Sequence, residues 1–268
     1  MNNGDCTVLV CSCDKYADLL SPFSFLWRKF WPDCPFKTVL VTETAPEDDG
    51  LCFDKIIACG RGGNWCSRLV SALSQIDTPY VLMLCDDYYL RERVDTGVVL
   101  KRLWQIKSFN AFNLRMIPNP VPGRDNSVSF GHDTDLLRYK PGTAYSIATQ
   151  AGLWNRAFLS SLAEGKSSIW EFERYGSFDL KAAERPLLVT PTKEFPFVDA
   201  VHKGYWEKFG LAVCRANGAP VDTAARTLPP LKVRIIEGMK AIVFRIVPTT
   251  LLVRVQNKFA LGAKERKK

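Results

Sequence analysis

The chain has 268 residues, of which 47% are hydrophobic and 24% are charged. These proportions are ordinary for a globular protein, and they exclude a disordered chain and a bundle of membrane spans. The formal net charge is +8. Residues 231–268 account for all of it, with ten basic and two acidic side chains. The remaining body is neutral and therefore does not indicate a nucleic-acid-binding protein.

The numbers of cysteines and histidines indicate the cellular compartment of the protein and the kind of metal site it can form. Nine cysteines form an odd set without a Cys-x-x-Cys pair, so we expect reduced thiols and a cytoplasmic protein. Two histidines argue against a zinc site. The first residues, 1–5, lack the basic and apolar regions of a signal peptide, and we expect no secretion signal.

Apolar strands and amphipathic helices alternate through the first half of the chain. In order, they are predicted as strand 6–13, helix 19–30, strand 36–42, strand 53–59, helix 65–75, strand 80–85, helix 96–108 and strand 111–117. Asn64 and Asp95 directly precede two of the helices, where their side chains can cap the helix. The alternation predicts an α/β fold with a mostly parallel, doubly wound sheet.

The second half is less regular. The Pro- and Gly-rich stretch 118–124 predicts a loop. It is followed by an edge strand at 145–148, a helix at 153–163 and a late strand at 187–190. Gly and Pro clusters then bracket a linker at 218–230. We therefore expect one catalytic domain over residues 1–218 and a linker with a basic tail over 219–268.

The segment 80–90 is the most informative part of the chain. An apolar strand delivers two adjacent carboxylates, Asp86 and Asp87. Ionised carboxylates cost several kcal/mol each to bury without partners, so we expect the pair at the exposed C-terminal end of the strand. Two hard oxygen donors there suit Mg²⁺ or Mn²⁺, which in turn suits a diphosphate. A helix cap or a loop pair without function remains the alternative, although Asp95 fits the capping role better.

Several segments together resemble a known enzyme family. They are residues 13–23, 31–36, 42–43, 65–69, 80–90, 141–145 and 170–173, with Trp154 between the last two. In order and spacing they are similar to a family of bacterial GT-A-type glycosyltransferases that build capsular and lipopolysaccharide chains. The resemblance covers roughly residues 5–210 and leaves the tail outside. It implies a Rossmann-like central sheet with flanking helices that binds a nucleotide-sugar, with a UDP-sugar as the expected donor.

The resemblance also implies residues for the donor. Asp14 and Glu43, at the ends of the first two strands, would hydrogen-bond ribose or base, although either is also a common turn residue. Arg68 would reach the diphosphate, and Trp65, one helical turn away, would also contact the donor. The alternative for Arg68 is a solvated helix face.

Asp86 and Asp87 would have different roles at the donor. Successive strand side chains point in opposite directions, so Asp87 would bind Mn²⁺ or Mg²⁺ while Asp86 approaches the ribose or sugar. This departs from the spaced Asp-x-Asp pattern of the family, so one protein carboxylate would hold the metal.

The acid pair after Trp170 and a late histidine complete the expected site. The resemblance favours Glu173 as the base that takes the acceptor proton in an inverting transfer, with Glu171 as a neighbour. A solvated acidic pair is the alternative. His202 would bind the metal or the diphosphate, and Lys203 would bind a donor phosphate. The alternative for His202 is a packed or surface residue without such a role.

The tail predicts a membrane contact. Residues 231–247 place apolar side chains largely on one face of a helix, and the segment carries basic residues suited to an anionic membrane surface: Lys232, Arg234, Lys240, Arg245 and Arg254. The uncharged run between Arg245 and Arg254 is too short to span a bilayer. Packing of this helix on the body or on a second subunit is the alternative.

Together these patterns predict a hexosyl- or related sugar transferase on the inner face of the bacterial cytoplasmic membrane. Its acceptor would be a membrane-linked glycan of surface polysaccharide synthesis. A nucleotidyltransferase is the nearest rival, although no glycine-rich, lysine-containing phosphate loop follows the first strand. A non-catalytic sugar- or lipid-binding scaffold is the other alternative. The sequence leaves the donor sugar, the acceptor and the stereochemical outcome open.

Overall fold

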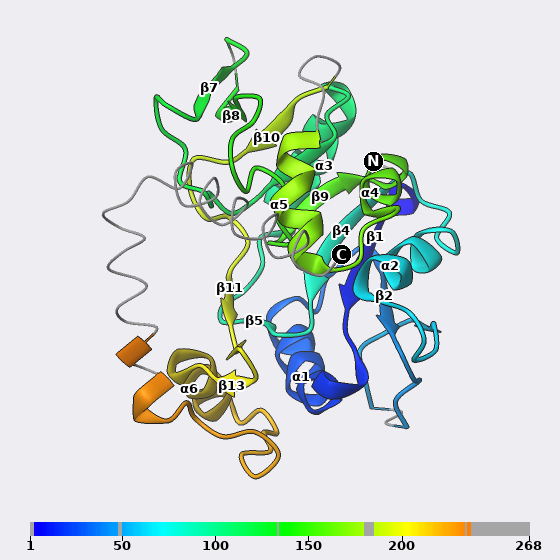
Figure 1. The fold of residues 1–268 in the computed structure, drawn as a ribbon, viewed down its shortest axis with the longest axis vertical. Coiled ribbons are helices and arrows are strands. Elements are labelled where there is room, and N and C mark those ends of the chain that lie inside the picture. The colour runs from blue at the N-terminus through cyan, green and yellow to red at the C-terminus, as the bar shows by residue number, and fades with distance from the viewer. Residues whose placement is uncertain (1–2, 48–49, 133, 180–184, 234, 237–268) are drawn as a thin grey trace, which may run out of the picture.

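The computed structural model describes residues 3–47, 50–132, 134–179, 185–233 and 235–236. Within them, nine strands form one sheet in the order β3-β2-β1-β4-β9-β6-β10-β8-β7 (Figure 1). The strands are β1 (Cys6–Cys11), β2 (Lys37–Thr42), β3 (Lys55–Ala58), β4 (Tyr80–Cys85), β6 (Asn113–Arg115), β7 (Ser127–Phe130), β8 (Leu136–Tyr139), β9 (Gly152–Asn155) and β10 (Leu187–Val189). All run in one direction except β8 and β9, which are antiparallel to their neighbours. The predicted mostly parallel α/β fold is confirmed.

The centre of the sheet is β1, which pairs in parallel with β2 on one side and β4 on the other. Leu9 lies opposite Val39 and Met83 in these two pairings. Every residue of β1 is buried, because helices cover both faces of the sheet. A continuous apolar run with β-branched residues is the pattern that such a central parallel strand requires.

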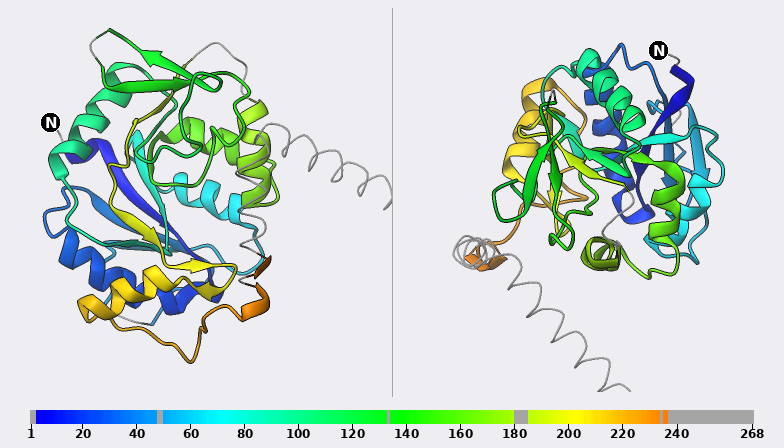
Figure 2. Two further views of the ribbon diagram at one scale, coloured as in Figure 1. Left: turned by 90° about the vertical axis from the view of Figure 1, so that its left-hand side faces the viewer. Right: turned by 90° about the horizontal axis from the view of Figure 1, so that it is seen from above.

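Within the described residues, helices cover both faces of the sheet (Figure 2). They are α1 (Leu20–Phe30), α2 (Trp65–Leu73), α3 (Thr96–Ser108), α4 (Arg156–Ala163), α5 (Ile169–Asp179) and α6 (Lys208–Asn217). The apolar side chains of α1, α3 and α6 share one core with alternate residues of β1 and β4. Those of α2, α4 and α5 pack with the intervening residues on the other face. This is the alternation of a doubly wound sheet.

Short paired strands extend the fold beyond β4. After a two-residue turn the chain forms β5 (Tyr88–Leu90), which pairs antiparallel with β11 (Phe197–Asp199). A small hairpin of β12 (Val201–His202) and β13 (Tyr205–Trp206) follows and leads into α6. These elements bring residues near 200 back to the end of β4.

Three predictions for the second half are wrong or incomplete. Residues 145–148 form turns rather than an edge strand. The predicted helix 153–163 begins as strand β9, and only from Arg156 does it become α4. The hairpin of β7 and β8 was not predicted. Short segments of three or four residues carry too little periodicity to distinguish a strand from a turn or a helix.

The expected linker after residue 218 packs on the body. Arg226 is 6% exposed, and its guanidinium donates two hydrogen bonds to the Asp18 carboxylate, at 2.9 and 2.8 Å. Asp18 belongs to the 3₁₀ helix η2 (Asp14–Leu19), which follows β1. The Trp206 amide also donates to the Thr227 carbonyl at 3.0 Å.

The tail is described only at its start. Lys232 is exposed within a helical turn, whereas Arg234, Lys240, Arg245 and Arg254 lie outside the described residues. Leu231, Ile235 and Ile236 are 66%, 54% and 42% exposed, so these apolar side chains do not pack on the body. A search of the described residues finds no helix long and apolar enough to cross a membrane.

Candidate active site

The candidate site lies at the carboxyl edge of the central strands. Because β1, β2 and β4 are parallel, their C-terminal ends meet at one edge of the sheet. Asp14 follows β1, Glu43 follows β2 and Asp86 follows β4. The antiparallel β9 begins at the same edge, since Gly152 pairs with Met83. The prediction that these acids follow neighbouring strand ends is thus confirmed. Asp14 and Glu43 were assigned to a site only by resemblance, whereas the metal site was predicted at Asp86 and Asp87 from their own chemistry.

Asp86 is buried, in contrast to the exposed position that we expected. It is 7% exposed, and its carboxylate accepts a hydrogen bond from the Ser12 hydroxyl at 2.5 Å. Burial raises the pKa of Asp86 to about 7, and the hydrogen bond from Ser12 opposes this rise. Ser12 is the residue after β1, and nothing in the sequence singled it out.

Asp87 is half-buried in the turn between β4 and β5. Its backbone carbonyl accepts from the Ala200 amide at 2.7 Å, which fixes the turn against the end of β11. Burial raises the pKa of Asp87 well above its usual range, and the charges of Asp86 and Asp199 raise it further. Asp199, on β11, was missed by the sequence reasoning because only the pairing of β5 with β11 brings it here.

The residues at this turn fit a hard divalent cation held by few protein ligands. Asp86 and Asp87 are adjacent carboxylates whose ionised forms are disfavoured by burial and by each other, and a cation would relieve both effects. Within the described part of the chain, no three His, Cys, Asp or Glu side chains converge as a preformed metal site. Phosphate and water would have to supply the remaining ligands.

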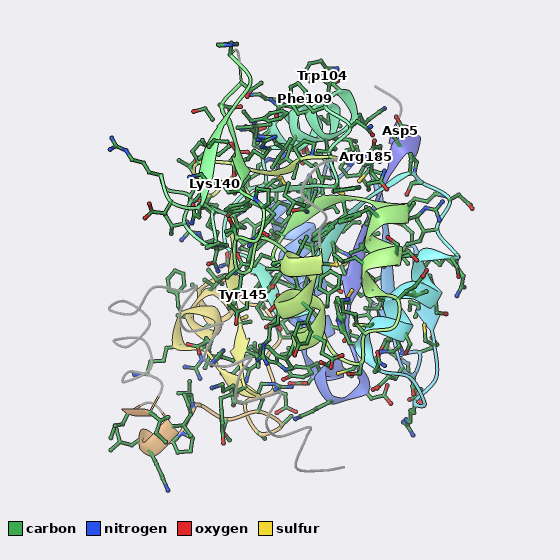
Figure 3. All side chains as sticks on the ribbon, turned by 45° about the horizontal axis from the view of Figure 1, so that its top comes forward. Asp5, Trp104, Phe109, Lys140, Tyr145 and Arg185 are labelled. Carbon is green, nitrogen blue, oxygen red and sulfur yellow. The ribbon has the colours of Figure 1, made fainter. Side chains whose placement is uncertain are left out.

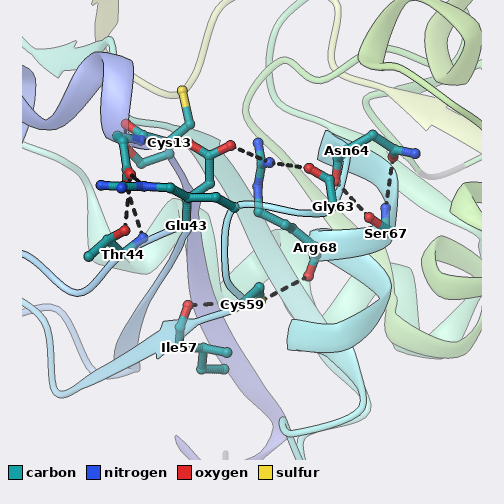
Figure 4. Close-up of polar contacts among 12 residues, drawn as sticks. Cys13, Glu43, Thr44, Ile57, Cys59, Gly63, Asn64, Ser67 and Arg68 are labelled. Carbon is teal, nitrogen blue, oxygen red and sulfur yellow. Dashed lines mark hydrogen bonds and ion pairs between the residues drawn. The ribbon is translucent and has the colours of Figure 1, made fainter.

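Glu43 joins the first two strand ends to α2 (Figure 4). Its Oε1 accepts from Arg68 Nη1 at 2.8 Å, and its Oε2 accepts from the Asp14 amide at 3.0 Å. Arg68 also donates to the Gly63 carbonyl at 2.9 Å and is 9% exposed, so it does not lie on a solvated helix face. The expected donor residues are brought together, but the structure pairs Arg68 with Glu43.

Asp14 faces the loops beyond β2 and β3. Its carboxylate accepts from the Thr44 amide at 2.9 Å and the Thr44 hydroxyl at 3.0 Å. Arg61 donates to the same carboxylate at 2.7 Å, and this contact lowers the pKa of Asp14. Asp14 is therefore held in place as an acceptor at the outer side of the site.

Trp65 connects α2 to α5. It is the first residue of α2, whose N-terminus is capped by the Asn64 side chain through the Ser67 amide, as predicted. The ring packs edge-on against Phe172 of α5, with centroids 5.3 Å apart. Trp65 thus helps to fix α5 and the acids that it carries.

Glu173 is held by one oxygen only. Its Oε1 accepts from the Thr149 amide and from the Thr149 hydroxyl, both at 2.7 Å. Its Oε2 accepts no hydrogen bond from the described residues. The charges of Glu173 and Asp87 both act on the Cys85 thiol, whose pKa is raised mainly by burial. Glu173 and Asp87 therefore both lie near the end of β4.

Glu171 points to the start of its own helix. Its Oε2 accepts from the Ser167 amide at 2.8 Å and the Ser167 hydroxyl at 2.6 Å. The Ser168 hydroxyl in turn accepts from the Glu171 amide at 3.2 Å. These reciprocal bonds closely match a capping box, which stabilises the N-terminus of α5.

His202 and Lys203 lie on the β12–β13 hairpin and are exposed. His202 is close enough for its charge to act on Asp199. Lys203 adopts a left-handed backbone conformation, with φ of 52°, at the tip of the hairpin. The structure therefore brings His202 to the edge of the aspartate cluster by way of Asp199.

Arg226 was not predicted as part of the site. Besides its pair with Asp18, it donates to the Gly204 carbonyl at 3.0 Å and lies over the Tyr16 ring, 4.6 Å from the centroid. Its positive charge lowers the pKa of both Asp86 and Asp87 against the effect of burial. Arg226 lies more than 130 residues beyond the aspartates in sequence, within a stretch that reads as a linker.

Comparisons with known proteins give weak likenesses. No family model matches the chain, and no curated protein matches it. Among solved structures, a mannosyltransferase from Pyrobaculum calidifontis in complex with GDP-Man and Mn²⁺ has a TM-score of 0.48 at 11% identity, covering 98% of this chain and 86% of its own. S. aureus TarS 1-349 has a TM-score of 0.41 at 14% identity, covering 69% of this chain.

A cytidylyltransferase from Leptospira borgpetersenii has a TM-score of 0.40 at 11% identity, covering 80% of this chain and 95% of its own. The aligned part spans 60% of TarS 1-349. At these scores the likenesses do not assign a family or an activity, and the function is argued below from the residues of this chain.

Proposed function

We propose that the protein is a glycosyltransferase that moves a sugar from a nucleotide-sugar to a hydroxyl of a glycan acceptor. The observation that carries the proposal is the position of Glu173. Thr149 fixes one of its oxygens, while the other accepts no hydrogen bond from the described residues. The charges of Glu173 and Asp87 both act on the Cys85 thiol at the end of β4, which supports a base near the acidic turn.

The donor half of the proposal rests on the acids at the ends of β1, β2 and β4. Asp14 and Glu43 offer carboxylate oxygens to ribose and base hydrogen-bond donors, and Asp86 offers one to a sugar or ribose hydroxyl. Asp87, with His202 at the edge of the cluster, would hold Mn²⁺ or Mg²⁺, which would neutralise the departing diphosphate. Arg68 and Lys203 are the cationic side chains assigned to the phosphates. Arg68 would have to exchange its contact with Glu43 for one with a phosphate.

The transfer half rests on Glu173. Its free oxygen takes the proton from the acceptor hydroxyl as that oxygen attacks the anomeric carbon, and the nucleoside diphosphate leaves from the opposite face. This gives inversion of configuration without a covalent intermediate. Glu171 supports the reaction by fixing the start of α5.

The cellular part of the proposal comes from the tail. A basic amphipathic segment after residue 230 would bind the anionic inner face of the bacterial cytoplasmic membrane and keep the site near a lipid-linked acceptor. Synthesis of a surface polysaccharide, capsule or lipopolysaccharide, is the process that offers such an acceptor.

Nucleotide binding tests the proposal. The melting temperature is measured with UDP, GDP, CDP and TDP, each with and without Mn²⁺, and the stabilising nucleotide defines the sugar donor to be supplied. We expect one diphosphate to stabilise the wild type only with metal and to lose this effect in Asp87→Asn. Asp77→Asn, an exposed surface change, is the matched control.

The released product distinguishes a glycosyltransferase from a nucleotidyltransferase, its nearest alternative. A glycosyltransferase releases the nucleoside diphosphate from the sugar donor, whereas a nucleotidyltransferase given a nucleoside triphosphate releases pyrophosphate. Release of pyrophosphate, or the absence of stabilisation by any nucleotide, would contradict the proposal.

A further inference from the structure

Arg115 is a buried cation at the end of β6. It is the last residue of β6, is 0% exposed, and lies between Gly152 of β9 and Val189 of β10 in the sheet. The order β4-β9-β6 places it two strands from Asp86, away from Glu43 and Asp14. Neighbouring strands are about 4.8 Å apart, so the offset from β4 is about 10 Å.

The guanidinium of Arg115 is largely unsatisfied. Its Nη1 donates to the Tyr145 carbonyl at 2.7 Å and more weakly to the Ser146 carbonyl at 3.5 Å. Its Nε and Nη2 are buried without a hydrogen-bond partner among the described residues. Arginine carries five N–H donors, and a buried charge without partners opposes folding. The fold itself therefore leaves one edge of this cation unused.

The chain segment that bonds to Arg115 through the Tyr145 carbonyl also bonds to Glu173 through Thr149. Glu173 and Tyr88 are close enough to act on Arg115 electrostatically, and the Tyr139 ring lies 5.9 Å from the guanidinium carbon. No carboxylate of the described residues bonds to Arg115, whose partners among them are the carbonyls of Tyr145 and Ser146. Glu173 instead bonds to Thr149.

We propose that the Nε and Nη2 edge of Arg115 binds an oxyanion, a carboxylate or a phosphate, carried by the acceptor. The inference rests on the proposed function, because it makes the acceptor the ligand beside Glu173. Nε–H and Nη2–H form a planar fork that matches two oxygens of one oxyanion. A neutral sugar hydroxyl would satisfy only one of these donors and leave the charge uncompensated.

The segment between β8 and β9 bonds to the guanidinium of Arg115. Tyr145 adopts a left-handed conformation, with φ of 58°, which is strained for a bulky side chain (Figure 3). This strain presents the Tyr145 carbonyl to Arg115. The same segment contacts α5 twice, through the Ile147 amide to Ser177 at 3.0 Å and through Thr149 to Glu173. Displacement of Tyr145 would relieve the strain and would also release the Nη1 donor of the guanidinium.

Arg115→Met separates a binding role from a structural one. Methionine keeps much of the volume and removes the unsatisfied charge, so we expect the melting temperature of the variant to stay level or rise. If Arg115 instead has structural partners that stabilise the fold, the melting temperature falls by several degrees, and the inference is wrong. Arg124→Met, at an exposed arginine, is the matched control.

Arginine Nε–H resonances report binding directly. In the wild type, glucuronic acid or inorganic phosphate should shift one Nε–H signal that is absent from Arg115→Lys, whereas glucose should not. The more effective probe distinguishes a carboxylate from a phosphate acceptor group. A shift caused by the nucleoside diphosphate alone would assign the edge to the donor and overturn the acceptor inference, as would no shift with either anion.

The results distinguish a failure of the acceptor inference from a failure of the proposed function. If a nucleoside diphosphate binds but neither anion shifts the Arg115 signal, only the acceptor inference is lost. If the anions bind and no nucleotide does, the Arg115 site stands as an anion site and the transferase proposal is lost. With an acidic acceptor in hand, Arg115→Met should lower kcat/KM by about tenfold to a hundredfold, the range expected for a lost charged hydrogen bond.

Discussion

Two glutamates of one helix have different environments two residues apart. Glu171 bonds to Ser167 and closes the first turn of α5, whereas Glu173 projects to Thr149 and the end of β4. Residues separated by two positions in a helix do not share a face. The same side-chain chemistry is therefore used once for helix capping and once, in our proposal, for proton transfer.

Replacement of each glutamate by glutamine tests this division. Glu173→Gln should lower turnover by about 10²- to 10⁴-fold, the usual contribution of a general base, and leave nucleotide affinity unchanged. Glu171→Gln should keep most of the turnover and lower the free energy of unfolding by about 1 kcal/mol or less, because an amide accepts the capping bonds less strongly. Initial rates and chemical denaturation measure the two effects.

Equal losses of turnover in both variants would contradict the assignment of Glu173 alone as the base. A large loss in Glu171→Gln with normal turnover in Glu173→Gln would move the base to Glu171. Unchanged turnover in both would remove the carboxylates of α5 from the mechanism.

At the scale of elements, α6 fixes the position of the aspartate cluster. Gly210 lies against Ala200, where a β-carbon would come within 2.5 Å of the Ala200 α-carbon and 3.0 Å of the Asp199 carbonyl oxygen. Ala200 in turn donates its amide to the Asp87 carbonyl. Close packing of a helix glycine on this backbone therefore supports the turn that carries Asp87.

Gly210→Ala should separate α6 from Ala200. Alanine gains up to about 1 kcal/mol in helix propensity, but overpacking costs about 1 to 3 kcal/mol, so we expect a net destabilisation of about 1 to 2 kcal/mol. Nucleotide and metal affinity should fall as well, because Asp87 shifts with Ala200. Denaturation curves and nucleotide titrations measure both effects.

Gly62→Ala provides the control. Gly62 is exposed and a β-carbon there meets no atom within 4 Å, so its substitution should change stability by less than about 0.5 kcal/mol. If Gly210→Ala were equally silent, the proposed support of Asp87 by α6 would be wrong.

Elements differ in how well the sequence predicts them, and length is the reason. Strand β4 and helix α3 have the predicted bounds, because an unbroken apolar run and a capped amphipathic repeat are strong local signals. Strand β9 was taken for the start of a helix. Its four residues are a strand because they pair with β4 and β6 on both sides, a contact that local pattern does not encode.

At the scale of the whole molecule, the C-terminal segment closes the fold. Arg226 connects residues near the end of the described chain to η2, which follows the first strand. The exposed apolar residues at 231 and 235–236 come directly after this contact. The body therefore extends at least to Thr227, and the candidate membrane segment starts soon after it.

Two truncations distinguish the body from the tail. A chain ending at residue 218 loses the buried pair of Arg226 with Asp18, and we expect it to lose about 3 kcal/mol or more of stability. A chain ending at residue 230 keeps that pair and should unfold like the full chain. Chemical denaturation compares the three proteins.

The same truncations test the membrane proposal. The full chain should co-sediment with anionic vesicles, and the interaction should weaken at high salt because surface charges are screened. The chain ending at residue 230 should remain in the supernatant. If it still co-sediments, the tail is not the membrane contact.

The sequence by itself determined the α/β architecture and the positions of the central strand ends. Strands β1, β2 and β4 are long apolar runs, and parallel pairing places the residues that follow them at one edge. The resemblance assigned Asp14 and Glu43 to a donor site, but the strand pattern already predicted that Asp14, Glu43 and Asp86 follow these strand ends. Local periodicity is sufficient for this, because helices cover both faces of the sheet.

Only the tertiary structure decided the environment of each site residue. It buried Asp86 against Ser12, paired Arg68 with Glu43, fixed Glu173 through Thr149, and left one edge of Arg115 unbound among the described residues. The three hydrogen bonds among these contacts join residues that are 24 to 74 positions apart in sequence. The burial and the partners that determine the charge of each site residue come from such distant pairs. No local sequence pattern specifies these pairs.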